Sequence, residues 1–302
     1  MKNIPVSYFS QVPVDAAERE FADVVRQLAD AGARYMAAGL EVMQNAVRPG
    51  GPAVVAAMRR TVESAGMAFR GAHAPWGDDW DLNATDPAER TRMLANQRRM
   101  IDLAGELAAD LLVMHPGDMA CRDRTPDLAA LHEALCRTLD ELLPYAEKRG
   151  VRIALENIFG RTDGPDQLTA VCREYGTPTL GCCLDTGHAN VLEAAPGKTS
   201  EQMNAYIRDT IWQGKMRFYP GSVADALAPY VITAHIHDNR GTDDEHLMPG
   251  AGSVDWAHVT KCLREDCPRL AFVQNEASWS RHGVTAAENV AAFERLFGGA
   301  AR

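Results

Sequence analysis

Eight short apolar runs alternate with longer amphipathic segments along the chain, and this alternation constrains the fold more than any other feature of the sequence. The runs cover residues 4–9, 35–43, 68–74, 111–115, 152–156, 180–185, 231–237 and 271–276. Several are apolar at nearly every position, which is typical of parallel strands buried on both faces. The clearest helical segments are residues 16–31, 87–109, 127–149 and 286–296. Pro126 before the third of these and Gly150 after it fit the residue preferences of helix starts and ends.

Eight strands, each followed by a helix, predict the α/β class and a closed (β/α)8 TIM barrel rather than an open sheet. No GxGxxG motif follows a strand, so nothing favours a dinucleotide-binding fold. Because such barrels often exceed 250 residues and no linker-like segment interrupts the chain, we expect residues 1–302 to form one domain. Residues 37–39 are poor strand formers. Residues 190–225 are expected to form a long loop containing a short helix, of the kind that often covers an active site.

Composition bears on partners and location. The net charge is −10, which argues against a surface for nucleic acid. Residues 1–10 hold one lysine and no apolar core of a signal peptide, and no apolar run approaches the roughly 20 residues of a membrane span. We therefore expect a cytoplasmic protein with no membrane contact. The seven cysteines lack CxxC spacing and are expected to be small buried hydrophobic residues, with adjacent Cys182 and Cys183 facing opposite ways.

Potential metal ligands gather at the predicted carboxyl ends of the strands, where barrel enzymes hold their active sites. They are His73, His115, Glu156, Asp185, His188, His235, His237 and Glu276, with His246 in the loop after the seventh strand. One such residue alone would be only a hydrogen-bonded or ion-paired side chain. Together, they would repel one another or stay unsatisfied without a cation. Imidazole and carboxylate ligands favour Mn²⁺, Zn²⁺, Co²⁺ or Fe²⁺, with Mg²⁺ kept as a candidate, and the lack of thiolates excludes a closed structural zinc site.

Two further features border these strand ends. Residues 249–256 are glycine-rich and lead into the next helix, so we expect a tight turn with an N-cap at Ser253 or Asp255, with a phosphate cradle as the alternative. Trp76, Trp80 and Trp279 lie just past strand ends and could form an apolar wall for the C–H face of a sugar.

The motifs at these positions resemble those of the xylose isomerase-like TIM-barrel superfamily. They are Val-Met-His-Pro-Gly (113–117), Ala-Leu-Glu-Asn (154–157), Cys-Leu-Asp-Thr-Gly-His (183–188), His-Ile-His-Asp-Asn (235–239), Asp-Glu-His (244–246) and Pro-Gly-Ala-Gly-Ser-Val-Asp-Trp (249–256). The superfamily includes sugar-phosphate isomerases and epimerases, ketose 3-epimerases, inosose-handling enzymes and endonuclease IV-type AP endonucleases. Related enzymes often form dimers or tetramers, so a homo-oligomer is compatible with the resemblance.

The resemblance to ketose epimerases implies one Mn²⁺ or similar ion. Its ligands would be Glu156, Asp185, Glu276 and one histidine of the strand-seven pair. Alignment with the epimerases favours His237, whereas the endonuclease pattern favours His235, and the choice stays open. The two glutamates would also exchange protons. The candidate substrate contacts are His188, Arg240, Trp76 and Asn157.

The resemblance to the endonucleases implies a three-metal site instead. It would comprise His73, His115, Glu156, Asp185, His188, His235, Asp244, His246 and Glu276. However, no Lys/Arg-rich loop follows the third, fourth or seventh strand, so nucleic acid is not the expected partner.

The leading hypothesis is a metal-dependent sugar or sugar-phosphate isomerase or epimerase with a small carbohydrate substrate. The ion would chelate the substrate carbonyl and stabilise an enediolate, while Glu156 or Glu276 removes the neighbouring proton. The alternatives are phosphodiester hydrolysis at abasic sites, dehydration of an inosose-like polyol, and a barrel that only binds a ligand. One bound ion would favour isomerisation or dehydration, and three would favour hydrolysis.

Overall fold

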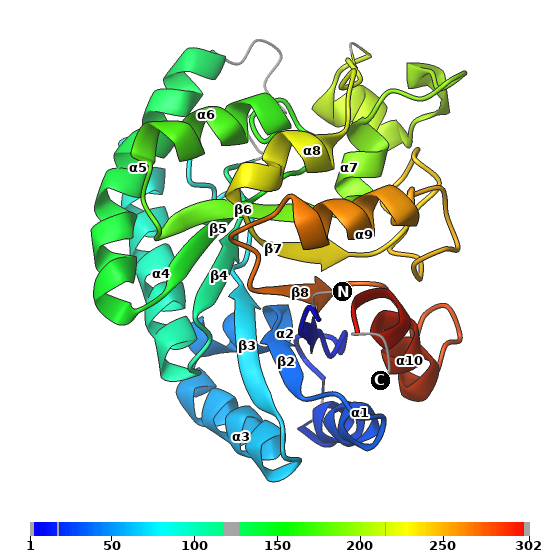
Figure 1. Cartoon of the computed structure of the whole chain (residues 1–302). Helices are drawn as coiled ribbons and strands as arrows, with labels where there is room; N and C mark the ends of the chain where they lie inside the picture. The colour runs from blue at the N-terminus through cyan, green and yellow to red at the C-terminus, as the bar shows by residue number, and fades with distance from the viewer. Residues whose placement is uncertain (1–2, 17, 118–126, 215, 299–302) are drawn as a thin grey trace.

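The computed structural model describes residues 3–16, 18–117, 127–214 and 216–298. Eight parallel strands close into a barrel in chain order, with β8 pairing back to β1. The strands are β1 (Val6–Tyr8), β2 (Tyr35–Ala38), β3 (Ala68–His73), β4 (Leu111–Met114), β5 (Arg152–Glu156), β6 (Leu180–Asp185), β7 (Val231–Ile236) and β8 (Phe272–Asn275). This confirms the predicted (β/α)8 barrel (Figure 1).

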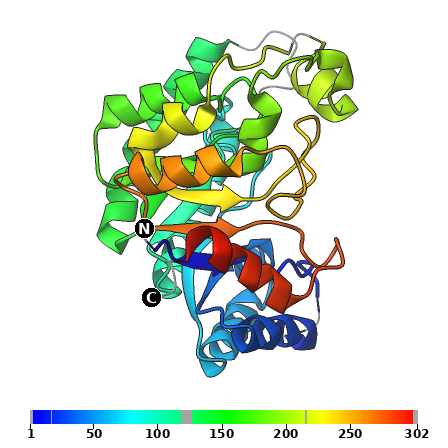
Figure 2. The same cartoon turned by 45° about the vertical axis from the view of Figure 1, so that its right-hand side comes forward.

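Helices surround the strands. The longer ones are α1 (Glu18–Asp30), α3 (Gly51–Ser64), α4 (Pro87–Glu106), α5 (Leu128–Arg149), α6 (Pro165–Tyr175), α9 (Trp256–Glu265) and α10 (Ala286–Phe297). The four predicted helical segments are confirmed to within three residues at each end. Gly150 ends α5 in the left-handed conformation at φ 69°, whereas Pro126 lies outside the described residues. Figures 1 and 2 show α9 and α10 over the outer face of β7 and β8.

The second apolar run contains the main error in the predicted boundaries. The strand ends at Ala38, and residues predicted as its continuation form the short helix α2 (Leu40–Met43) after Gly39. A short apolar run does not distinguish a buried strand from a buried helical turn, because periodicity needs a longer window. The consequence is that Glu41 leaves the strand and becomes part of the barrel mouth.

Two apolar layers stabilise the barrel. Inside it, Leu111, Val113, Ala154, Cys183, Ile232 and Phe272 form one buried cluster. The alternate residues of the same strands, such as Leu112, Ile153 and Cys182, belong to the larger cluster between strands and helices. Cys182 and Cys183 therefore face opposite ways, as predicted. The alternation places the strand-end ligands on a packed floor rather than over an open channel.

The segment after β6 is more structured than predicted. Helix α7 (Thr186–Leu192) begins at once. A short 3-10 helix (Ser200–Gln202) and a short π-helix (Tyr206–Ile211) follow before α8 (Val223–Leu227). The ammonium group of Lys198 fixes the path by donating to the carbonyl oxygens of Asn190, Val191 and Glu193 at 2.7, 2.8 and 2.8 Å. No helix in the described part of the chain combines the length and apolarity needed to cross a membrane.

The glycine-rich loop after β7 is a turn organised by a buried carboxylate. Asp238 accepts hydrogen bonds from Gly250 N (2.8 Å), Val254 N (3.1 Å) and Trp256 Nε1 (2.8 Å). Asp255 is the N-cap of α9 and accepts from His258 N at 3.0 Å, so Asp255 rather than Ser253 has the predicted capping role. Because Asp238 occupies two of the loop's backbone N–H groups, the turn interpretation is favoured over a phosphate cradle.

Candidate metal centre at the barrel mouth

Four predicted ligands converge at the carboxyl ends of β5 to β8, and we call Glu156, Asp185, His235 and Glu276 the central cluster. The Nδ1 atom of His235 lies 3.2 Å from Glu156 Oε1, 3.0 Å from Glu276 Oε2 and 3.8 Å from Asp185 Oδ2. Glu156, Asp185 and His235 are buried, whereas the Glu276 side chain is 23% exposed. The central cluster is therefore accessible from the side of Glu276.

Two flanking clusters adjoin the central one. In the first, Glu156 Oε2 lies 3.0 Å from His73 Nε2 and 3.3 Å from His115 Nε2. In the second, Asp244 Oδ2 lies 3.3 Å from His188 Nε2 and 3.1 Å from His246 Nε2.

His188 links the second flanking cluster to the centre, because its Nδ1 atom is 3.4 Å from both Glu156 Oε1 and Asp185 Oδ1. Glu156 likewise belongs to both the first flanking cluster and the centre. All nine residues of the three-metal pattern thus lie in one connected group.

His235 and His237 occupy different surroundings, although both are fully buried. His235 lies on β7 and reaches both glutamates of the central cluster. His237 follows the strand; its Nε2 atom lies 3.0 Å from both Asp185 oxygens, and its ring stacks on His246 at 4.1 Å between centroids. The geometry therefore favours His235 as the ligand shared with the glutamates.

The donors present fit a divalent cation. Among the described side chains, His235 Nδ1, Glu276 Oε2 and Asp244 Oδ1 are buried polar atoms with no hydrogen-bond partner. Buried polar atoms are nearly always satisfied, so such orphans need an explanation. His235 Nδ1 and Glu276 Oε2 are close enough to interact but lack hydrogen-bond geometry, as expected for ligands directed at a common ion. Nitrogen and oxygen donors of this kind suit Mn²⁺, Zn²⁺ or Co²⁺.

The electrostatics of the site indicate how it is balanced without an ion. Burial by itself raises the pKa of Glu156, but the charges of His235 and His115 outweigh it and hold the pKa well below its usual value. Burial likewise opposes the shift at His246, where the hydrogen bond and charge of Asp244 raise the pKa to about 9. Glu156 is thus ionised and His246 is protonated, whereas burial lowers the pKa of His115 and favours its neutral form. A cation could replace the proton of a protonated imidazole.

Backbone contacts position the ligands. The Asn157 side-chain amide donates to Asp185 O at 3.1 Å and accepts from Asp185 N at 2.8 Å, so it holds the ends of β5 and β6 together. Asp185 in turn caps α7 by accepting from His188 N at 2.6 Å. At Gly187, a Cβ atom would lie 2.0 Å from His237 Cε1, so only glycine permits this close approach.

The loop after β7 has a strained backbone conformation at His246. His246 has φ 49°, a left-handed conformation that non-glycine residues seldom adopt. Its Nδ1 atom lies 3.1 Å from Glu276 O, while Nε2 faces Asp244. Such strain persists only where surrounding contacts maintain it, and it is frequent at functional sites.

A cavity of about 280 Å³ borders the central cluster at Glu276. Its lining includes His73, Trp76, His246, Glu276 and Arg281. Trp76 is 46% exposed and stacks on His115 with 5.0 Å between ring centroids, which suits the predicted role of an apolar wall. Of the other predicted wall and substrate residues, Trp80, Trp279, Asn157 and Arg240 are outside this lining. Trp279 is buried, and Arg240 is an exposed partner of Glu245.

Glu41 is a site residue that the sequence interpretation missed. It lines the same cavity, is only 4% exposed, and accepts a 2.6 Å hydrogen bond from Ser10 Oγ. Burial raises its pKa to about 7. The available signal was a charged residue inside an apolar run that would otherwise be a fully buried strand.

Comparison with known proteins agrees with the fold. The family model described as xylose isomerase-like TIM barrel matches residues 7–267. The uncharacterized protein MJ1311 of Methanocaldococcus jannaschii is 30% identical over 206 residues, which cover 64% of this chain and 59% of that relative. The match therefore spans less than two thirds of the relative's length.

Solved structures share the architecture at low identity. D-allulose 3-epimerase from Methylomonas sp. in complex with D-allulose has a TM-score of 0.71 and 16% identity, with 98% of each chain covered. A xylose isomerase-like TIM barrel protein from Mycobacterium smegmatis in complex with magnesium has a TM-score of 0.64 and 16% identity, covering 97% of this chain and 95% of that one. At such identities the likeness shows the fold alone. The family match over residues 7–267 shows that this chain belongs to the xylose isomerase-like TIM barrel family.

Proposed function

We propose that the protein is a divalent-metal-dependent isomerase or epimerase of sugars or sugar phosphates. The observation that carries the proposal is the central cluster, in which Glu156 and Glu276 lie 3.2 and 3.0 Å from the same histidine nitrogen and Glu276 lines a cavity. This arrangement supplies both a metal site and carboxylates that can exchange protons with a substrate. The D-allulose 3-epimerase that shares the fold makes ketoses the first substrate class to test.

Glu156, Asp185, His235 and Glu276 would hold the ion, for which Mn²⁺, Zn²⁺, Co²⁺ and Mg²⁺ are the candidates. When bound, the ion would act as a Lewis acid that polarises a substrate carbonyl and acidifies the neighbouring C–H group. The flanking clusters could hold further ions, because imidazole and carboxylate ligands already lie next to one another in each cluster.

Glu276 is the better placed of the two glutamates to remove a proton. It lines the cavity and is 23% exposed, whereas Glu156 is 1% exposed and lies within 3.4 Å of four histidine nitrogens. A positioned carboxylate of this kind accelerates proton transfer by about 10²- to 10⁴-fold. Glu156 would then chiefly organise the imidazoles around it, and it remains the candidate for the second proton transfer.

The cavity supports a small carbohydrate substrate. Its volume of about 280 Å³ is near the lower end of the range for small-ligand pockets, roughly 300 to 1,000 Å³. Trp76 offers a flat apolar surface for the C–H face of a sugar. Arg281 at the lining offers a positive charge, which would suit a phosphorylated ketose.

Solvent hydrogen exchange tests this function. The metal-loaded protein is incubated in D₂O with a panel of ketoses and ketose phosphates, and NMR follows the hydrogen next to the carbonyl. We expect deuterium incorporation into at least one ketose, reduced about 10²- to 10⁴-fold in Glu276→Gln. Glu245→Gln, which alters a carboxylate paired with Arg240 outside the cavity lining, should leave the rate unchanged. Absence of exchange across the metal-loaded panel would overturn the proposal.

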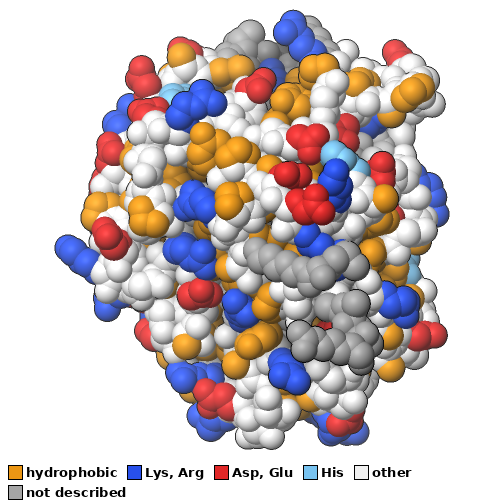
Figure 3. Space-filling view, in the orientation of Figure 1, with side chains coloured by type: hydrophobic (Ala, Val, Ile, Leu, Met, Phe, Trp, Pro, Cys, Tyr) orange, Lys and Arg blue, Asp and Glu red, His pale blue; other side chains and the backbone are white. Residues whose placement is uncertain are grey.

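The flanking clusters favour one second candidate, a multi-metal phosphodiesterase. Three adjacent groups of ligands could hold ions that activate water, as hydrolysis of a phosphodiester requires. Against it, the net charge is −10, and Figure 3 shows acidic and basic side chains interspersed over one face of the molecule. Cleavage of an abasic duplex by the metal-loaded protein, without deuterium exchange into ketoses, would make this candidate the leading one.

A further inference from the structure

A second set of metal-ligand side chains lies outside the barrel, between two of the surrounding helices. His132 and Cys136 lie on α5, and Glu174 lies near the end of α6. His132 Nε2 is 3.6 Å from Cys136 Sγ and 3.4 Å from Glu174 Oε2, and Cys136 Sγ is 4.0 Å from Glu174 Oε2. Three different donors, one nitrogen, one sulfur and one oxygen, thus form a compact triangle.

The triangle matches one face of a zinc tetrahedron. Bond lengths of about 2.05 Å to nitrogen, 2.3 Å to sulfur and 2.1 Å to oxygen give edges of about 3.6 Å for N–S, 3.4 Å for N–O and 3.6 Å for S–O. The first two observed separations agree with these edges, and the third is 4.0 Å. A small movement of the Glu174 side chain, which is 58% exposed, would close the difference.

The two helices hold the donors in position before any ion binds. His132 and Cys136 are four residues apart, so their side chains lie on the same face of α5. Tyr175, next to Glu174, places its hydroxyl 2.7 Å from Cys136 O and 2.9 Å from Asp140 Oδ1, which fixes the end of α6 against α5. The packing of α6 on α5 therefore keeps the backbones that carry the three donors close together without an ion.

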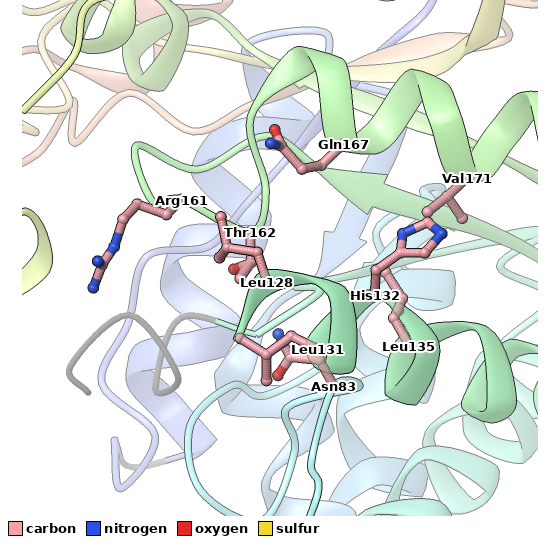
Figure 4. A pocket seen from close by; sticks show the side chains of 9 residues that line it. All are labelled: Asn83, Leu128, Leu131, His132, Leu135, Arg161, Thr162, Gln167 and Val171. Carbon is pink, nitrogen blue, oxygen red and sulfur yellow. The ribbon is translucent and has the colours of Figure 1, made fainter. Parts of the chain in front are cut away.

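The surroundings of His132 favour coordination. Figure 4 shows the His132 imidazole between α5 and α6, with Val171 beside it. Leu135 and Val171 line the same small pocket and lie beside the ring in Figure 4, so apolar side chains border one side of it. Its side chain is nevertheless 38% exposed, which leaves the triangle open to an ion from solvent. A low-polarity wall strengthens the attraction between a cation and the ligands it shields.

We propose that His132, Cys136 and Glu174 form a second metal site, for a borderline-soft divalent cation such as Zn²⁺, which joins α5 to α6. The three side chains supply three ligands, and water would take the fourth position. The Cys136 thiol gives its proton to solvent when the metal–sulfur bond forms.

Cobalt spectroscopy on the full chain tests the site independently of any catalytic activity. The protein is stripped of metal and titrated with Co²⁺, and the near-ultraviolet sulfur-to-cobalt charge-transfer band is recorded. We expect the band in the wild type, its loss in Cys136→Ser, and its displacement by Zn²⁺. His132→Ala and Glu174→Gln should weaken cobalt binding by more than about 100-fold, since loss of an outer-shell partner alone costs 10- to 100-fold.

The matched control is the cysteine beneath the barrel mouth. Cys183 lies within ligand distance of Glu156 and His235, so it is one alternative source of a thiolate band. The band should therefore persist in Cys183→Ala. Circular dichroism of metal-free Cys136→Ser should equal that of the wild type, because Cys136 is only partly buried. The proposal is overturned if the wild type gives no band, or if Cys183→Ala abolishes the band while Cys136→Ser retains it.

Discussion

The Nδ1 atom of His235 lies 3.0 Å from Oε2 of Glu276, and neither atom has a hydrogen-bond partner. His237, by contrast, directs Nε2 at both oxygens of Asp185, 3.0 Å away. If His235 is the ligand shared with the glutamates, replacing His235 should weaken binding of the central ion more than replacing His237. We expect His235→Ala to weaken metal binding by more than about 100-fold. His237→Ala should retain the ion with a smaller loss of affinity, and equal losses measured by competition with a chelating dye would contradict this assignment.

The Asn157 side chain holds Asp185 in place through both its donor and its acceptor. Replacing Asn157 with alanine leaves a buried N–H and a buried carbonyl unsatisfied, at about 1–3 kcal/mol each. Urea denaturation of metal-free Asn157→Ala should therefore show a loss of about 2–6 kcal/mol in the free energy of unfolding. Asn96→Ala, which removes one exposed hydrogen bond to Asp79 O, is the control and should cost less than about 1 kcal/mol. An equally small loss of unfolding free energy in Asn157→Ala would show that the Asn157 amide does not hold Asp185 in place.

Glu41 should make stability depend on pH. Burial raises its pKa to about 7, above the usual value of 4.5 for an exposed glutamate. Between these values the folded chain binds more protons than the unfolded chain, so stability falls as the pH rises through this window. Glu41→Gln keeps an acceptor for Ser10 but removes the ionisation. At pH 8 it should be more stable than the wild type by up to about 3 kcal/mol, with the difference vanishing near pH 4. If the unfolding free energies of the wild type and Glu41→Gln changed in parallel with pH, the raised pKa of Glu41 would be disproved.

Two arginines near the loops should differ in their effect on substrate binding. Arg281 lines the cavity, whereas Arg240 is 64% exposed and paired with Glu245. If the substrate is a ketose phosphate, Arg281→Ala should raise KM about 10- to 150-fold, which corresponds to a charged hydrogen bond of about 1.5–3 kcal/mol. Arg240→Ala should change KM much less. If Arg240→Ala raised KM more than Arg281→Ala, Arg240 would be the substrate contact that the family resemblance implies.

The sequence was sufficient to predict the barrel and to identify most of the residues of the candidate site. Carboxyl ends of parallel strands meet at one rim, so residues at those ends had to be neighbours whatever the details of packing. The choice between His235 and His237 could not be made in this way, because β7 ends at Ile236 and the alternation of side chains does not extend to His237.

Other features depended on tertiary contacts that no local pattern reports. Glu41 was hidden by an apolar run that continues from a strand into a short helix. The pair His132 and Cys136 has helical spacing, but Glu174 is 38 residues beyond Cys136 and is brought to it only by the packing of α6 on α5.

We propose that the strand ends hold metal through Glu156 and Glu276. The most direct measurement is the number of divalent ions per chain, by mass spectrometry of protein purified without chelator. Cys136→Ser serves as the background, so that the proposed helical site does not contribute. We predict at least one ion per chain in this background and its loss when Glu156→Ala and Glu276→Ala are added. Absence of metal from the background protein, even after incubation with excess Mn²⁺, Zn²⁺, Co²⁺ or Mg²⁺, would contradict the account.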